Sequence, residues 1–167
     1  YRPTAIYNVP TLFLELLKRP DFRALDFSGV QYFGSGASPF PAESIKELEA
    51  LVGAGKLIEV YGMTETSPML TALPRDGVKK AGSVCIPLPD TEVRLVDPDT
   101  NQEVPLGAPG EFVARGPQVF TRGYHNKPEE TAFTLRNGWI HTGDVAVMDE
   151  DGYLFIVDRR KDMISVS

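Results

Sequence analysis

The segment EVYGMTETSP, residues 59–68, places an aromatic ring, a glycine, a hydroxyl and a carboxylate directly after an apolar run. The Tyr61 ring could stack on a flat base, and Gly62 lets the backbone approach a ligand closely. Thr64 offers its hydroxyl to a phosphate oxygen. Glu65 offers a hard oxygen ligand to Mg²⁺, which takes one or two protein carboxylates and completes its shell with phosphates and water. The set suits a nucleotide with its metal, but a polar strand exit with Thr and Glu capping a helix explains the same residues, so both interpretations stay open.

A second candidate segment is GSGASPF, residues 34–40, which follows a predicted strand. Its small residues allow a flat ring to lie against the backbone. A turn in which Ser38 caps a helix beginning near Pro41 is another physical interpretation, and the two are compatible.

Two polar residues near the end of the chain complete the candidate set. Asp144, in GWIHTGD, could accept two hydrogen bonds from the vicinal hydroxyls of a ribose, although by itself a solvated turn aspartate explains it better. Arg159 carries several donors for ribose or phosphate oxygens, whereas Arg160 is interpreted as part of a solvated basic cluster. His141 follows two apolar residues, so we interpret it as a partly buried structural residue and not as a base.

These residues depend on the elements that position them. Pro10 begins a predicted short helix, and residues 30–34 (VQYFG) are typical of a strand. A helix with apolar residues at helical spacing follows Pro41 and ends at Gly53, and KLIEVYG, residues 56–62, is predicted as the next strand. Strand, helix and strand with short links indicate a βαβ unit in a parallel sheet, whose carboxyl edge is where α/β proteins bind ligands.

From about Gly77 the sequence predicts short strands separated by turns, with one short helix beginning at Pro128. This pattern indicates a small barrel or sandwich. The predicted fold class is therefore mixed α/β, with a partial parallel α/β lobe over residues 1–75 and a barrel-like β lobe over 76–157. The predicted strands lie in residues 91–97 and 103–116 and in a hairpin over 144–160 with its turn at 150–152.

Composition and charge limit the function classes. A formal net charge of -6 and an isoelectric point near 4.9 argue against a nucleic-acid-binding protein, but not against a small phosphate-bearing ligand. The single cysteine, Cys85, excludes an internal disulfide and fits a reducing compartment. The two histidines lack partners at metal-ligand spacing, which disfavours zinc, and no apolar run is long enough to span a bilayer. We expect a cytoplasmic protein whose contact with membranes is at most peripheral.

Taken together, YGMTET, GWIHTGDVAVMDEDGYLFIVDRRKDMI and the opening YNVPTLFLELLKRPDFRALDFSGVQYFGSGAS resemble the adenylate-forming superfamily of acyl-CoA synthetases, luciferases and peptide-synthetase adenylation domains. The resemblance covers essentially the whole chain and is greatest to long-chain fatty-acid–CoA ligases. It implies part of the family's large N-terminal domain, followed by a hinge within residues 158–167. It also implies that Thr64 and Glu65 are catalytic, that Glu65 binds the metal, and that the nucleotide-binding set is Ser35, Gly36, Ala37, Ser38, Glu59, Tyr61, Gly62, Thr64, Asp144, Ile156 and Arg159.

The reaction of the family joins a carboxylate to ATP, which gives acyl-AMP and pyrophosphate, and then transfers the acyl group to the thiol of coenzyme A. The resemblance therefore implies ATP or AMP, Mg²⁺ and coenzyme A as ligands. It implies a division of labour in which adenine lies between Gly36-Ala37 and Tyr61 with Ile156 at its side, Asp144 and Arg159 bind the ribose, and Thr64 binds the α-phosphate.

The sequence departs from the family pattern in several ways. Tyr1 and the closing residues lie inside patterned stretches, so we expect a piece of a longer protein. The glycine-rich phosphate loop and the lysine-bearing C-terminal domain of the family are not found in these residues, and without them the chain should not catalyse adenylation. Ser35 replaces a common glycine, which should be tolerated, and Val60 replaces a glycine that borders the acyl tunnel, which we expect to be narrower.

Other functions remain open at the level of sequence. Within the superfamily, an aryl-acid or short-acid CoA ligase, or an acyl-AMP ligase that feeds a carrier protein, fits the same motifs. A non-catalytic nucleotide-binding module is a different class of function. The presence of all the expected site residues argues against it: Tyr61, Thr64, Glu65, Asp144 and Arg159.

Overall fold

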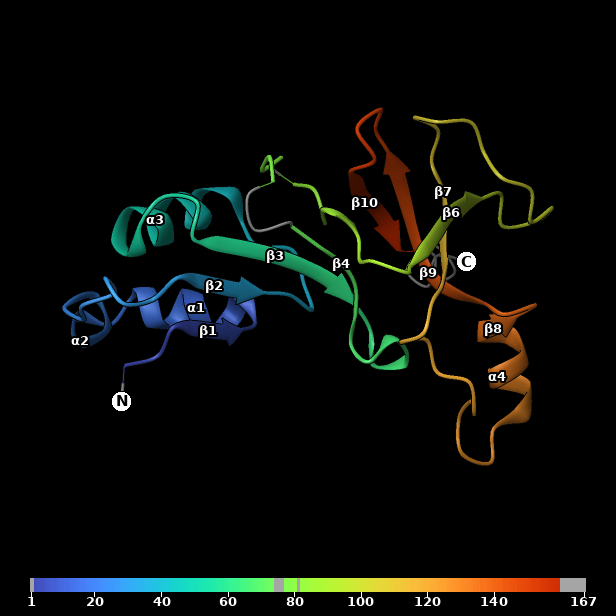
Figure 1. The fold of residues 1–167 in the computed structure, drawn as a ribbon, viewed down its shortest axis with the longest axis horizontal. Helices are drawn as coiled ribbons and strands as arrows, with labels where there is room; N and C mark the ends of the chain where they lie inside the picture. The colour runs from blue at the N-terminus through green and yellow to red at the C-terminus, as the bar shows by residue number, and fades with distance from the viewer. Residues whose placement is uncertain (1, 74–76, 81, 160–167) are drawn as a thin grey trace, which may run out of the picture.

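The computed structural model describes residues 2–73, 77–80 and 82–159, which form two sheets with separate hydrophobic cores (Figure 1). The first sheet, with α1 to α3, lies on the left of Figure 1, and the second, with α4, lies on the right. The strands of the first sheet are, in spatial order, β1 (Ala5–Asn8), β2 (Tyr32–Ser35), β3 (Leu57–Gly62), β4 (Met69–Ala72) and β5 (Ile86–Pro87).

The helices beside the first sheet begin where proline or the apolar pattern predicts. Helix α1 (Pro10–Leu17) and the short α2 (Pro20–Arg23) each carry proline at the first turn, and α3 (Ala42–Val52) follows Pro41. The predicted helices after Pro10 and Pro41 are therefore confirmed. The predicted Ser38 cap is wrong: Pro41 is the N-cap residue of α3, without a side-chain cap, and Ser38 lies three residues earlier on an exposed bend.

The predicted βαβ unit is confirmed, because β2 and β3 are parallel neighbours with Phe33 opposite Leu57. The predicted strand 30–34 begins later and extends to Ser35. Strands β1, β4 and β5 were not predicted: β1 pairs with β2 in parallel, and β4 turns back antiparallel to β3. Burial against the helices completes the first core, where Phe13, Phe33 and Leu48 are fully buried.

The second sheet is antiparallel in the order β10-β9-β7-β6, with β8 paired to β9. The hairpin of β9 and β10 is confirmed, as is the helix that begins at Pro128. One face of this sheet carries the second core, which includes Leu70 from β4 and the fully buried Phe112. The elements are β6 (Glu92–Val96), β7 (Gly110–Arg115), α4 (Pro128–Thr134), β8 (Leu135–Arg136), β9 (Trp139–Met148) and β10 (Leu154–Arg159).

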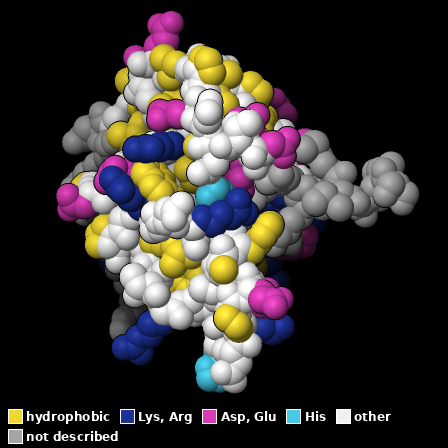
Figure 2. Space-filling view, turned by 90° about the vertical axis from the view of Figure 1, so that its right-hand side faces the viewer, with side chains coloured by type: hydrophobic (Ala, Val, Ile, Leu, Met, Phe, Trp, Pro, Cys, Tyr) yellow, Lys and Arg dark blue, Asp and Glu magenta, His cyan; other side chains and the backbone are white. Residues whose placement is uncertain are grey.

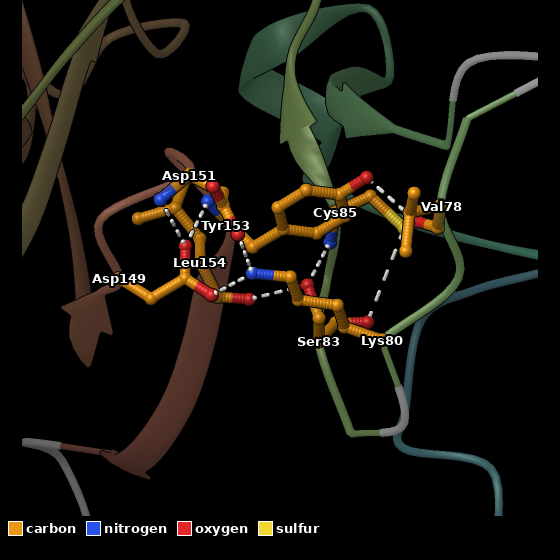
Figure 3. Close-up of polar contacts among 8 residues, drawn as sticks. All are labelled: Val78, Lys80, Ser83, Cys85, Asp149, Asp151, Tyr153 and Leu154. Carbon is orange, nitrogen blue, oxygen red and sulfur yellow. Dashed lines mark hydrogen bonds and ion pairs between the residues drawn. The ribbon is translucent and has the colours of Figure 1, made fainter.

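A polar cluster ties the segment before β5 to the β9–β10 hairpin (Figure 3). The Lys80 ammonium contacts the carboxylates of Asp149 at 2.5 Å and Asp151 at 2.6 Å, and it lies over the Tyr153 ring. The Tyr153 hydroxyl donates to the carbonyl of Val78 at 2.6 Å. These contacts hold the hairpin, whose second strand ends at the candidate residue Arg159, against the link between the sheets.

The two sheets meet near the predicted boundary between residues 75 and 76. Strand β5 lies after that boundary but pairs with β4 in the first sheet, while Tyr61 and Met63 from before the boundary pack against the second core. The division into 1–75, 76–157 and 158–167 therefore stays a prediction. Of the predicted hinge only Asp158 and Arg159 are described, both within β10, and Arg160 and Lys161 lie outside the described residues.

Candidate functional site

Three residues form the centre of the candidate site, one from β3 of the first sheet and two from the paired strands β9 and β10 of the second. The Tyr61 hydroxyl, near the end of β3, donates to Oδ2 of Asp144 in β9 at 2.5 Å. Nε of Arg159, the last residue of β10, donates to Oδ1 of the same carboxylate at 2.8 Å. Asp144 and Arg159 are opposite each other in the β9–β10 register. The structure thus brings together the three side chains that the sequence proposed for a nucleoside.

Asp144 is not the solvated turn residue that its local sequence favours. It lies inside β9 and is 4% exposed, and its own N–H donates to the hydroxyl of Thr142. Burying a carboxylate is unfavourable unless hydrogen bonds and an opposite charge compensate it. Arg159, which is exposed, supplies that charge from the rim.

The environment keeps Tyr61 protonated. Burial, and after it the negative charge of Asp144, raise the pKa of Tyr61 far above the ordinary value of a tyrosine. The phenol is therefore a hydrogen-bond donor over the physiological range. The ring stacks on Phe112 of β7, with centroids 5.1 Å apart and planes at 24°, so only the opposite face is left for a base.

Thr64 and Glu65 lie on a single 3₁₀ turn, η1 (Thr64–Thr66), directly after β3. The turn is fixed by Thr66, which is fully buried and whose hydroxyl accepts from the Met63 N–H at 3.0 Å and donates to the Pro68 carbonyl at 2.8 Å. The Thr64 side chain is exposed and Glu65 is half-buried. The Thr64 side chain is therefore accessible at a corner that hydrogen bonds hold in place.

Tyr124 is a site residue that the sequence reasoning missed. Its hydroxyl donates to Oε1 of Glu65 at 2.5 Å, and the backbone N–H of Phe120 donates to the Glu65 carbonyl at 2.8 Å. Both come from the loop between β7 and α4. The only local signal was an aromatic residue after Gly123, which by itself predicts nothing. The contacts of Glu65 run to this loop and not to Asp144.

The small-residue segment 34–40 contains an unusual buried hydroxyl at the end of β2. Ser35 is 2% exposed, and its Oγ is the one buried side-chain oxygen or nitrogen without a hydrogen-bond partner among the described residues. Unpaired buried polar atoms are rare in folded proteins. Next to it, a Cβ on Gly36 would lie 2.8 Å from a methyl of Val60, so the loop packs closely on the strand that carries Tyr61. Ala37 has a left-handed φ of 72° and, like Ser38, is exposed.

Two further predicted residues lie along the neighbouring strands. Glu59 pairs in register with Ser35 and is half-buried; burial raises the pKa of its carboxyl, against a lowering by Lys79. Ile156 of β10 is half-buried and packs against the second core. Gly62 has a purely internal reason to be glycine, because a Cβ there would lie 1.9 Å from the Pro68 carbonyl oxygen.

The described residues hold no group of three or more His, Cys, Asp or Glu side chains placed to bind a metal. Glu65 fits the lesser requirement of a magnesium that arrives with phosphates, which needs one or two protein carboxylates. A hollow of about 370 Å³ lies between α1 and α3 and is lined by none of the predicted site residues. Within the described parts, no helix is both long and apolar enough to cross a bilayer.

Known proteins resemble this chain in sequence and show its family. Residues 1–125 match the family of AMP-binding enzymes. The chain is 47% identical over 167 residues to a long-chain-fatty-acid–CoA ligase of Escherichia coli O6:H1, and this match covers all of the chain but 29% of that ligase. The chain thus spans less than a third of the length of this relative.

Solved structures of related enzymes also resemble this chain. ATP-bound MatB from Rhodopseudomonas palustris is 37% identical with a TM-score of 0.85, over 96% of this chain and 32% of MatB. The anthranilate CoA ligase AuaEII in complex with anthranoyl-AMP is 29% identical with a TM-score of 0.87, over 97% of this chain and 30% of AuaEII. Their likeness confirms the mixed α/β fold expected for the N-terminal domain of adenylate-forming enzymes. The chain therefore belongs to the AMP-binding enzymes of the adenylate-forming superfamily.

Proposed function

We propose that this chain is the nucleotide-binding part of an ATP-dependent acyl-CoA ligase that acts on a fatty acid. The observation that carries the proposal is the joining of Tyr61, Asp144 and Arg159 across the two sheets. Long-chain-fatty-acid–CoA ligases among its relatives support the choice of acid. Cytoplasmic location with at most peripheral membrane contact belongs to the same proposal.

The adenine would lie between the Gly36-Ala37 backbone and the face of the Tyr61 ring opposite Phe112, with Ile156 beside it. Phe112 holds the ring from behind, so stacking would cost little side-chain entropy. The Ser35 hydroxyl, which has no hydrogen-bond partner among the described residues, supports a polar ligand next to the end of β2. Glu59 lies opposite Ser35 on β3.

The ribose would bind at Asp144. Each carboxylate oxygen has two lone pairs, so the oxygens that receive Tyr61 and Arg159 can accept further bonds from the vicinal hydroxyls. Because the carboxylate is already oriented and compensated, it can bind the sugar without reorganising. Arg159, whose side chain is exposed at the rim, would contact the same sugar.

The phosphate end would lie at the η1 corner, next to the residues that follow Gly62. The exposed Thr64 hydroxyl would donate to the α-phosphate, and Glu65, held by Tyr124, would bind Mg²⁺. The metal supplies charge neutralisation for the phosphates when bound. The set needs no histidine or cysteine base, because the carboxylate of the acid is itself the nucleophile in an in-line displacement at phosphorus.

In the proposed reaction the carboxylate attacks the α-phosphorus of ATP and pyrophosphate leaves, giving acyl-AMP. The thiol of coenzyme A then takes the acyl group and AMP leaves. The glycine-rich phosphate loop and the lysine-bearing C-terminal domain of the family, reached by a hinge at 158–167, would have to be supplied by other parts of a longer protein. The 167-residue chain should therefore release no pyrophosphate by itself.

The identity of the carboxylic acid substrate is the most detailed part of the proposal. Val60, beside the close-packed Gly36, would narrow the acyl tunnel, so Val60→Gly in the intact enzyme should shift preference toward longer or bulkier acids. A chain-length profile unchanged by this substitution would argue against the assignment. The alternative is an aryl or short acid, or a carrier-protein acceptor; the likeness to an anthranilate CoA ligase favours keeping the aryl acid in the screen.

Titration calorimetry of AMP into the chain tests the nucleotide site. Arg159→Gln should weaken AMP binding by about tenfold, the value of one charge-assisted hydrogen bond. Arg19→Gln is the matched control, because both arginines pair with an aspartate and their side chains are 64% and 63% exposed. No heat with AMP or ATP-Mg²⁺ would favour a non-binding module, and equal effects of the two substitutions would contradict the assignment of Arg159.

A further inference from the structure

The outer face of the second sheet, opposite its core, carries a polar hollow of about 50 Å³. The strand register places Arg94 of β6 beside Val113 of β7, and Val113 beside His141 of β9. Turns at either end add two asparagines and β8 adds an arginine. We call this the outer pocket; its polar and aromatic lining residues are Arg94, Asn101, Arg136, Asn137, Trp139 and His141. Figure 2 looks onto the side of the molecule that carries this face and shows basic side chains gathered around a histidine near its middle.

The guanidinium groups of two arginines in the outer pocket each contact a neighbouring residue. Arg94 lies over the Trp139 ring at 4.6 Å, and Nε of Arg136 donates to the Phe133 carbonyl at 2.7 Å. Within the described residues, no hydrogen bond uses the terminal nitrogens of either guanidinium. The nearest acid to Arg94 is Glu103, whose carboxylate lies 3.9 Å from Nε and is largely exposed. Both arginines therefore keep donors for a ligand.

His141 adds a buried polar atom at the floor of the pocket. The residue is 7% exposed, and its Nδ1 contacts Oε2 of the buried Glu111 at 3.1 Å, which leaves Nε2 as the ring atom for the pocket side. Asn101 and Asn137 sit in turns with left-handed φ values of 57° and 51°. The side-chain amides of these two asparagines make no hydrogen bond to any described residue. The strands and turns thus place several hydrogen-bond donors around the same small pocket.

The size of the outer pocket selects the ligand. A water needs about 10–15 Å³ of such space, and drug-sized ligands need roughly 300–1,000 Å³, so the hollow accepts a small ion or the end of a larger molecule. Arginine pairs suit tetrahedral oxyanions because of their planar fork of donors. We propose that the outer pocket binds a single phosphate group, a site distinct from the nucleotide site and independent of the proposed function.

Calorimetry with inorganic phosphate at low ionic strength tests this proposal on the 167-residue chain. We expect one phosphate per chain, and a loss of affinity of at least about tenfold for Arg94→Gln and for Arg136→Gln. Arg115→Gln is the matched control: Arg115 also lies over Trp139, at 4.8 Å, but it pairs with Glu92 through two hydrogen bonds and does not line the pocket. The affinity of the Arg115→Gln variant for phosphate should stay within about twofold of that of the parent chain.

Nitrogen-15 spectra of the imidazoles give a readout that does not depend on substitution. Phosphate should shift the His141 resonances and leave those of His125, the other histidine of the chain, unchanged. Competition then identifies the source: displacement by coenzyme A but not by dephospho-coenzyme A assigns the site to a 3′-phosphate, and displacement by neither assigns it to free phosphate. No heat, equal effects of all three arginine substitutions, or equal competition by chloride would overturn the proposal.

Discussion

Replacing Tyr61 by phenylalanine removes the hydroxyl that joins the two sheets while keeping the ring on Phe112. The hydroxyl donates to Asp144, which is 4% exposed. A hydrogen bond to a charged group contributes about 1.5–3 kcal/mol. Since Arg159 still compensates the carboxylate, we expect a loss near the middle of that range, about 2 kcal/mol at pH 7.

Tyr153→Phe is the matched control for this prediction. Tyr153 is 8% exposed and donates to a neutral backbone carbonyl at 2.6 Å, so its loss should be about 0.5–1.5 kcal/mol. Urea denaturation followed by circular dichroism measures both values, provided that the slopes with urea are equal. A loss for Tyr61→Phe no larger than for Tyr153→Phe would refute the reasoning that an ionised Asp144 is the acceptor.

The pH dependence gives a second measurement on the same pair of proteins. Because the folded state raises the pKa of Tyr61, the unfolded chain loses this proton first as the pH rises past about 10. The stabilisation is therefore complete below pH 10 and falls above it, by up to about 1.4 kcal/mol per pH unit. The other tyrosines cancel between parent and variant. The stability difference should be constant from pH 7 to 9 and shrink by pH 11; a constant difference would contradict the assignment.

Tyr124, Gly62 and Cys85 each give one further prediction. Tyr124→Phe frees the Glu65 carboxylate, so the gain in ATP affinity on adding Mg²⁺ should fall about threefold by calorimetry, while affinity without the metal should not change. Gly62→Ala should lower the free energy of unfolding by more than about 3 kcal/mol in urea denaturation. Gly29→Ala should lower it by less than about 1 kcal/mol, because no described residue beyond the two chain neighbours comes within 4 Å of the added Cβ. Equal costs would refute the steric argument. Burial raises the pKa of the Cys85 thiol to about 11, so iodoacetamide at pH 8 should react at least about 100-fold more slowly than in urea, and rapid labelling of the folded chain would contradict this.

The local sequence by itself predicted several helices and strands, and the candidate site residues that follow β3. Proline at a helix start and apolar spacing fixed α1 and α3, and the β9–β10 hairpin followed from its strand pattern and turn. From the side chains of Tyr61, Thr64 and Glu65 the sequence predicted base stacking, phosphate binding and metal binding at the corner after β3. Strands β1, β4 and β5, of two to four residues, were missed because so short a strand is specified by its neighbours and not by its own residues.

Only the tertiary structure decided the rest. Asp144 lies 83 positions from Tyr61, and its sequence favoured a solvated turn; strand pairing and the packing of two sheets made it a buried, paired carboxylate. The same long-range packing placed Tyr124 beside Glu65, left the Ser35 hydroxyl without a hydrogen-bond partner in the described part of the chain, and formed the outer pocket. Burial and partners are properties of which segments meet, and a window of a few residues carries no information about a contact made across the chain.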